Sequence, residues 1–113
     1  MAPDDLARFE QSAAAASRLL KAMAHDTRLL VLCQLLDGER AAGQIASRLS
    51  QSALSQHLGL LRSEGLVATR RHGQAIYYRI ADPAVQAVIS TLAGIFCPPE
   101  PQETTHVDVN LAP

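Results

Sequence analysis

Residues 50–80 read SQSALSQHLGLLRSEGLVATRRHGQAIYYRI, and a change of period inside this stretch decides the fold. In its first part, apolar residues recur at steps of three and four, which indicates an amphipathic helix. We expect this helix to begin at Ser50 or Ser52 and to end at Gly65. Its apolar stripe consists of Leu54, Leu58 and Leu61.

After Gly65 the period becomes two, so residues 66–71 and 75–80 are expected to form two short strands. The intervening His72-Gly73-Gln74 favours a tight turn. The stretch therefore predicts a helix followed by a β-hairpin.

Helical patterns flank this motif on both sides. Upstream, helices are predicted over 4–23, from a cap at Asp26 to Gly38, and from about Ala41 to Leu49. Downstream, Asp82 as cap and Pro83 open a mostly apolar helix that Pro98-Pro99 terminates.

This order of helices and hairpin predicts a mainly α winged helix-turn-helix in which the hairpin is the wing. We expect one DNA-binding and dimerisation domain over residues 1–97 and a flexible tail over residues 98–113.

The helix that follows Ser50 gathers polar side chains where a reader of the DNA major groove needs them. Short hydrogen-bonding side chains at the start of a recognition helix can reach base edges, and arginines on either side neutralise phosphates. The candidate DNA-binding residues are Gln51, Ser52, Ser55, Gln56, His57, Arg62, Arg70, Arg71 and Gln74.

The charge distribution supports this interpretation. The net charge is −1, but residues 40–80 hold six arginines and one acid, so this segment carries +5 and the remainder −6. A basic middle between acidic ends indicates an anion-binding face, for which nucleic acid is the obvious partner.

Four stretches between Leu20 and Phe96 resemble the ArsR-type bacterial repressors. They are LKAMAHDTRLL from residue 20, SQSALSQHLGLLR from residue 50, EGLV from residue 64 and RHGQAIYY from residue 71. The resemblance implies a homodimer whose first and last helices form the interface. It also implies two recognition helices that read a palindromic operator in double-stranded DNA.

The sequence departs from this family at one point. Between Leu49 and Ser50 the family usually has two more residues, which form the turn of the helix-turn-helix, and such a turn needs about three or four residues. Either the short helix ends early, near Ser47, or two residues are missing. We favour the second, which predicts a break in the chain beside Leu49.

Metal sensing is not indicated by the two helices that carry metal sites in the family. The segments 41–49 and 83–96 contain no Cys, His or carboxylate, and we expect no bound metal or other cofactor. His106 and Asp108 in the tail would make a poor metal site, so a metal-responsive repressor is the weakest alternative.

The chain has two cysteines, Cys33 and Cys97, and they are predicted to be its sensor thiols. Two small buried side chains are the alternative explanation. Their placement resembles the persulfide- and polysulfide-responsive subgroup (BigR-like and SqrR-like repressors), which carries one Cys in each of these two helices. The resemblance implies thiol modification or bridging by reactive sulfur, release of the operator and derepression of sulfide-detoxification genes. Peroxide or general oxidant sensing by the same thiols is the main rival, and we expect Cys33 to react first.

Other function classes fit less well. A thiol oxidoreductase would prefer Cys-x-x-Cys on a βαβ unit, and the four histidines show no hydrolase-like grouping, so we expect no enzyme and no catalytic residues. A winged helix used only for protein contacts would lack salt-dependent DNA affinity. With no signal peptide and no apolar stretch of about 20 residues, we expect a cytoplasmic protein without membrane contact.

Overall fold

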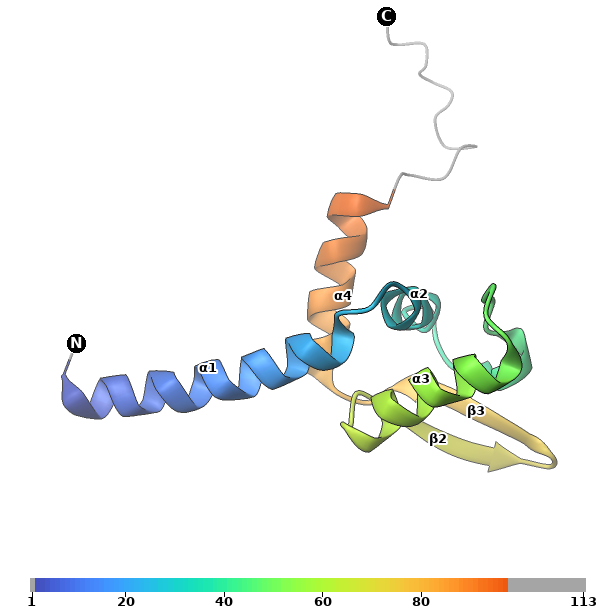
Figure 1. The fold of residues 1–113 in the computed structure, drawn as a ribbon, viewed down its shortest axis with the longest axis horizontal. Helices are drawn as coiled ribbons and strands as arrows, with labels where there is room; N and C mark the ends of the chain where they lie inside the picture. Colours follow the sequence, from blue (N-terminus) through green and yellow to red (C-terminus); the bar gives the residue numbers. More distant parts are fainter. Residues whose placement is uncertain (1, 98–113) are drawn as a thin grey trace, which may run out of the picture.

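The computed structural model describes residues 2–97, which form helices and one antiparallel sheet (Figure 1). In chain order the elements are α1 (Pro3–Met23), α2 (Asp26–Gln34), β1 (Arg40–Ala41), the 3-10 helix η1 (Ala42–Gln44), α3 (Gln51–Ser63), β2 (Val67–His72), β3 (Ala75–Ile80) and α4 (Pro83–Phe96). This order confirms the mainly α class with a β-hairpin wing. The predicted tail, residues 98–113, lies outside the described residues.

Helix α1 extends from the body of the molecule as a free rod (Figure 1). A proline at its start and two acids in its first turn suit a helix N-terminus. Its buried residues, Ala22 and Met23, lie at the other end. Near that end, Arg18 forms an ion pair with Glu64, with Nε 2.8 Å from the carboxylate, which links α1 to the end of α3.

Helix α2 begins and ends at other residues than predicted. His25 is the cap, because its Nδ1 accepts the Thr27 N–H at 3.1 Å, whereas Asp26 is the first helical residue. The helix stops at Gln34, since the next residues form a turn that precedes Gly38. Gly38 has a φ of +140°, a conformation that favours glycine.

The predicted helix from Ala41 to Leu49 is wrong, and so is the predicted break beside Leu49. The helix is reduced to the single 3-10 turn η1, and the chain continues without interruption through residues 45–50 to α3. A helix reaching Leu49 would have left one residue, Ser50, to reverse the chain before α3. Such a reversal takes about three or four residues. Residues 45–50 therefore form the connection to α3 instead of a helix.

Helix α3 and the hairpin form as predicted, with small shifts at their ends. Ser50 is the cap, its Oγ accepting the Ala53 N–H at 3.1 Å. Strands β2 and β3 pair from Val67 with Ile80 to His72 with Ala75, and β1 adds a third strand at the far edge of β3. Gly73 in the turn has a φ of +63°, as a two-residue hairpin requires.

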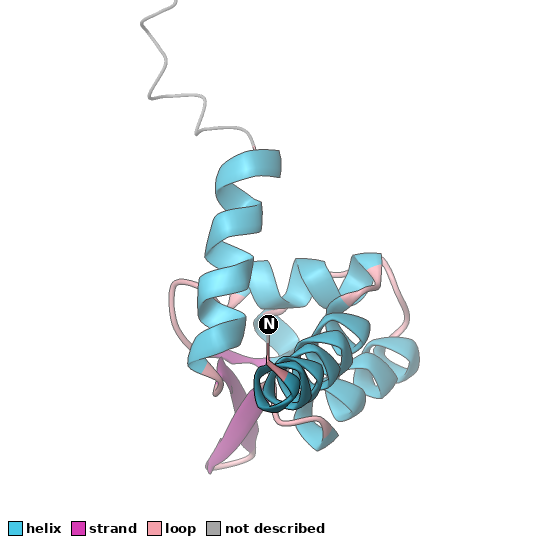
Figure 2. Ribbon diagram, turned by 90° about the vertical axis from the view of Figure 1, so that its left-hand side faces the viewer, coloured by secondary structure: helices cyan, strands magenta, loops and turns pink. Residues whose placement is uncertain are grey.

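The core lies where α2, α3, α4 and the start of β2 meet the end of α1. Figure 2 looks nearly along α1 and shows that α4 begins beside the hairpin and points away from it. As predicted, Asp82 caps α4, accepting the Ala84 N–H at 2.9 Å. The largest fully buried side chains are Met23, Leu32, Leu61, Leu66, Ile89, Val31 and Val85.

Among residues 2–97, no helix combines the length and the apolar character needed to cross a bilayer.

Candidate nucleic-acid interface and dithiol pocket

Helix α3 separates a buried apolar face from an exposed polar one. The apolar stripe predicted from the sequence is buried at Leu54, Leu58 and Leu61. The opposite face of the first two turns is exposed and carries Gln51, Ser52, Ser55 and Gln56. These side chains are free to donate and accept hydrogen bonds at the helix N-terminus, the arrangement with which recognition helices read base edges.

His57 lies apart from these four residues, half-buried against α2. The Arg28 guanidinium lies 3.2 Å from Nδ1 of His57. The centres of the His25 and His57 rings are 4.3 Å apart. A guanidinium can only donate, so Nδ1 accepts and the ring is neutral. Burial, with His25 and Arg28 nearby, lowers the pKa of His57. Arg28 also donates to the Ala22 carbonyl at 2.7 Å, so this cluster connects α3 to α2 and the end of α1.

The hairpin presents exposed cations, but one of them is already engaged. Arg70 forms an ion pair with Glu39, its Nε donating to the carboxylate at 2.9 Å, and its guanidinium stacks 4.7 Å from the centre of the Tyr77 ring. The hydrogen bond from Arg70 holds the pKa of Glu39 below its ordinary value. Arg71 and Gln74 are exposed near the hairpin tip.

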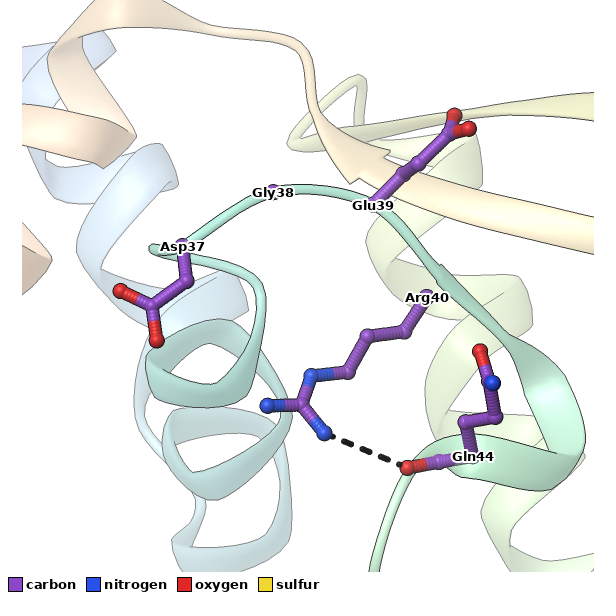
Figure 3. Close-up of a pocket in the computed structure, with 5 residues that line it drawn as sticks. All are labelled: Asp37, Gly38, Glu39, Arg40 and Gln44. Carbon is purple, nitrogen blue, oxygen red and sulfur yellow. Dashed lines mark hydrogen bonds between the residues drawn. The ribbon is translucent and has the colours of Figure 1, made fainter.

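Two further arginines of the basic segment differ in their roles. Arg62 is exposed near the end of α3. Arg40 instead turns inward, and its Nε donates to the Gln34 carbonyl at 2.9 Å. Its Nη1 donates to the Gln44 carbonyl at 3.5 Å (Figure 3). These bonds fasten η1 to the end of α2 beside a polar hollow of about 310 Å³. Figure 3 also shows Glu39 pointing to the other side of the strand, towards the hairpin.

The two cysteines share one pocket although 64 positions separate them. Cys33 on α2 is half-buried, Cys97 directly after α4 is exposed, and both are free thiols. The pocket between them has a volume of about 240 Å³ and an apolar lining of Leu29, Cys33, Ile89, Leu92, Ala93, Phe96 and Cys97. Burial, and the nearby Cys97 thiol, raise the pKa of Cys33.

Within the described part of the chain, no three His, Cys, Asp or Glu side chains gather closely enough to hold a metal ion. His106 and Asp108, the weak metal candidates of the sequence, lie outside the described residues.

Three contact residues were missed by reasoning from the sequence. Arg28 holds His57, Glu39 holds Arg70 and Gln34 holds Ala46, with its Oε1 2.8 Å from the Ala46 nitrogen and its Nε2 2.9 Å from the Ala46 oxygen. These partners are 12 to 31 positions apart in the chain, so no helical or strand period connects them.

Comparisons with known proteins agree with this geometry. Residues 25–69 match the family described as "Bacterial regulatory protein, arsR family". The chain is 48% identical over 98 residues to the transcriptional activator HlyU of Vibrio cholerae, covering 85% of this chain and 91% of the relative. It is 41% identical over 97 residues to the biofilm growth-associated repressor of Agrobacterium fabrum, covering 84% and 83%. The crystal structure of the transcriptional repressor BigR from Xylella fastidiosa superposes with a TM-score of 0.74 at 35% identity, covering 88% of this chain and all of that one.

Proposed function

The chain belongs to the arsR family of bacterial regulatory proteins and is a DNA-binding transcriptional regulator; from this premise we propose a repressor that responds to reactive sulfur. Modification or bridging of Cys33 and Cys97 by persulfide or polysulfide releases it from its operator. The observation that carries the proposal is the apolar pocket that holds both thiols in its wall. We infer repression because two of the three relatives above are named as repressors.

A homodimer explains the free surface of α1 and α4. Five large apolar side chains on these helices are between 49% and 76% exposed, namely Leu6, Phe9, Leu20, Ile95 and Phe96. A lone domain of this size gains nothing from leaving them in water, whereas pairing with a second copy buries them. Two copies present two recognition helices, which suits a palindromic operator.

DNA contact divides among the exposed residues of α3 and the hairpin. Gln51, Ser52, Ser55 and Gln56 face base edges, while Arg62, Arg71 and Gln74 approach the backbone on either side. We assign His57 to holding the recognition helix against α2 rather than to base reading, since its ring is half-buried against Arg28.

Cys97 is the thiol that attacks first, which reverses the order expected from the sequence. It is exposed, whereas burial disfavours the thiolate of Cys33. The Cys97 thiolate attacks a sulfur atom of an inorganic polysulfide, an S–S bond breaks, and a shorter polysulfide anion leaves. Cys97 then carries one or more additional sulfur atoms.

The second step joins the two helices. Cys33 loses its proton and attacks the Cys97 sulfur, and the additional sulfur leaves as hydrosulfide or as a polysulfide anion. Where Cys97 carries two or more additional sulfur atoms, Cys33 can instead attack the one bonded to Cys97, and the sulfur beyond it leaves as hydrosulfide or as a polysulfide anion. The product is a disulfide or a bridge with one more sulfur. In both cases the two thiols lose two electrons, and an S–S bond of the polysulfide accepts them.

The proposal is tested by mass spectrometry of the reduced protein after polysulfide or peroxide treatment, with DNA binding measured on the same samples. The probe is a duplex selected from a random-sequence pool by the reduced protein. We expect polysulfide to link Cys33 to Cys97 and to abolish DNA binding by the wild-type protein. The variants Cys33→Ser and Cys97→Ser should retain DNA binding after the same treatment. Loss of binding with peroxide alone would favour a general oxidant sensor. Binding that survives linkage of the thiols would refute the proposal.

A further inference from the structure

Gln34 connects α2 to the loop that leads into the recognition helix. Its side-chain amide holds both the N–H and the carbonyl of Ala46, at 2.8 Å and 2.9 Å. Among residues 2–97, these are the side-chain hydrogen bonds recorded between α2 and residues 45–50. The loop continues for four residues from Ala46 to Ser50, which caps α3.

Two features make this contact important for the start of α3. First, residues 45–50 contain no helix or strand that would hold the loop in place. Second, the hydrogen bond within the loop, from the Leu49 N–H to Ser47 Oγ at 3.0 Å, does not reach α2. The buried stripe of α3 and the Arg28–His57 contact hold the body of α3 against α2, and the Gln34 amide attaches the loop that leads into its start.

Gln34 also directly follows Cys33 in the last turn of α2. The backbone carbonyl of Cys33 accepts a hydrogen bond from the Leu36 N–H at 3.2 Å, so Cys33 is part of the turn that ends α2. A covalent link at Cys33 that displaces this turn would move the Gln34 side chain with it, because the two residues are neighbours on one helical backbone. A pair of hydrogen bonds at 2.8–2.9 Å does not tolerate a shift of an ångström without weakening.

We propose that Gln34 is the positioning residue that passes the state of the two thiols to the recognition helix. This inference rests on the proposed sulfur response. With free thiols, the Gln34–Ala46 pair fixes the loop and α3 in the arrangement that binds DNA. Once Cys33 is linked to Cys97, the pair opens and α3 loses that arrangement. Gln34 itself touches neither DNA nor sulfur.

The test compares Gln34→Glu with Gln86→Glu, a change of the same charge at an exposed position on α4. The glutamate cannot donate to the Ala46 carbonyl and repels it. We measure the dissociation constant of the selected duplex before and after polysulfide treatment. In the reduced state we expect Gln34→Glu to weaken binding roughly five- to ten-fold, the size of one lost hydrogen bond. The ratio of the dissociation constants of treated and reduced protein should therefore be five- to ten-fold smaller than in wild type, while Gln86→Glu keeps the wild-type ratio.

The outcomes separate this inference from the function on which it rests. If linked wild-type protein still binds the duplex, the sulfur response itself is refuted. If wild type responds and Gln34→Glu responds with the same ratio, Gln34 is only structural and the inference is overturned. Should Gln34→Glu fail to fold, hydrogen exchange of the Ala46 amide in wild type decides. We expect exchange at least ten-fold faster after linkage, and unchanged exchange would overturn the inference.

Discussion

Replacing Glu39 with glutamine is expected to strengthen DNA binding, although Glu39 lies outside the recognition helix. In the free protein Glu39 holds Arg70 by an ion pair, and Tyr77 covers one face of the same guanidinium. A phosphate that approaches the hairpin therefore competes with a carboxylate already in place. Glu39→Gln removes the charge of this competitor and keeps the shape of the side chain, so Arg70 becomes available to the DNA backbone.

The magnitude follows from counterion release. Each additional phosphate contact steepens the dependence of log K on log salt by about 0.9. Between about 50 and 200 mM salt, this makes the loss of affinity roughly 3.5-fold larger for one hairpin and about twelve-fold larger for the two hairpins of the proposed dimer.

The assay is fluorescence anisotropy of the selected duplex across this range of salt concentration. Asp37→Asn is the matched control, because it removes one negative charge two residues away, from a carboxylate that has no recorded ion pair with Arg70. Both variants gain the general benefit of a lower negative charge, and only Glu39→Gln should steepen the slope. Equal slopes for the two variants would show that Arg70 does not reach phosphate. A loss of affinity in Glu39→Gln would show instead that the ion pair shapes the hairpin for binding.

Three further predictions concern stability, each measured by urea unfolding at one fixed protein concentration. Leu61→Ala should lower the free energy of unfolding by about 3 kcal/mol, because Leu61 is fully buried, whereas Leu60→Ala at an exposed site should change it by less than about 0.5 kcal/mol. Ser50→Ala should cost about 1 kcal/mol through loss of the α3 cap, and an equal effect of Ser52→Ala would argue against capping as the cause. Because the pKa of His57 is lowered in the folded protein, the unfolded chain binds a proton at this residue more readily than the folded chain does. Stability from this group should therefore be complete above about pH 6.5 and decline as pH falls through the lower folded pKa, and His57→Gln should remove that part of the decline.

Periodicity was sufficient to predict most elements of the fold. The change from three- and four-residue steps to two-residue steps located α3 and the hairpin, and Asp82 located the start of α4. These signals are local, since they depend on which face of one element is buried.

The predicted helix from Ala41 to Leu49 was wrong because the position of the following helix, α3, determines how many residues the connection needs. Its residues are compatible with a helix, but the chain needed residues 45–50 to reach α3. The chain has two residues fewer than is usual in the family between Leu49 and Ser50, and this difference was the available signal. We interpreted it as a break in the chain rather than as a shortened helix.

The roles assigned to the candidate site residues stay predictions, and the contacts of these residues could not be predicted from the sequence. His57 follows Leu54 by three positions and precedes Leu61 by four, so its spacing already placed it on the buried stripe of α3. The pairing of Glu39 with Arg70 carries no such signal, because 31 positions separate the two residues. The shared pocket of the cysteines was expected from the family resemblance, not from any local pattern.

The free rod of α1 has a consequence for the life of the protein in the cell. From Pro3 to Lys21 this helix is exposed or at most half-buried, so it gains little from its own domain. A subunit without a companion offers proteases a long segment that opens easily, since helices without packing fray. For the proposed homodimer we therefore expect orphan subunits to be degraded faster than assembled ones. Such selective turnover would clear surplus monomer and couple the abundance of the regulator to its assembly.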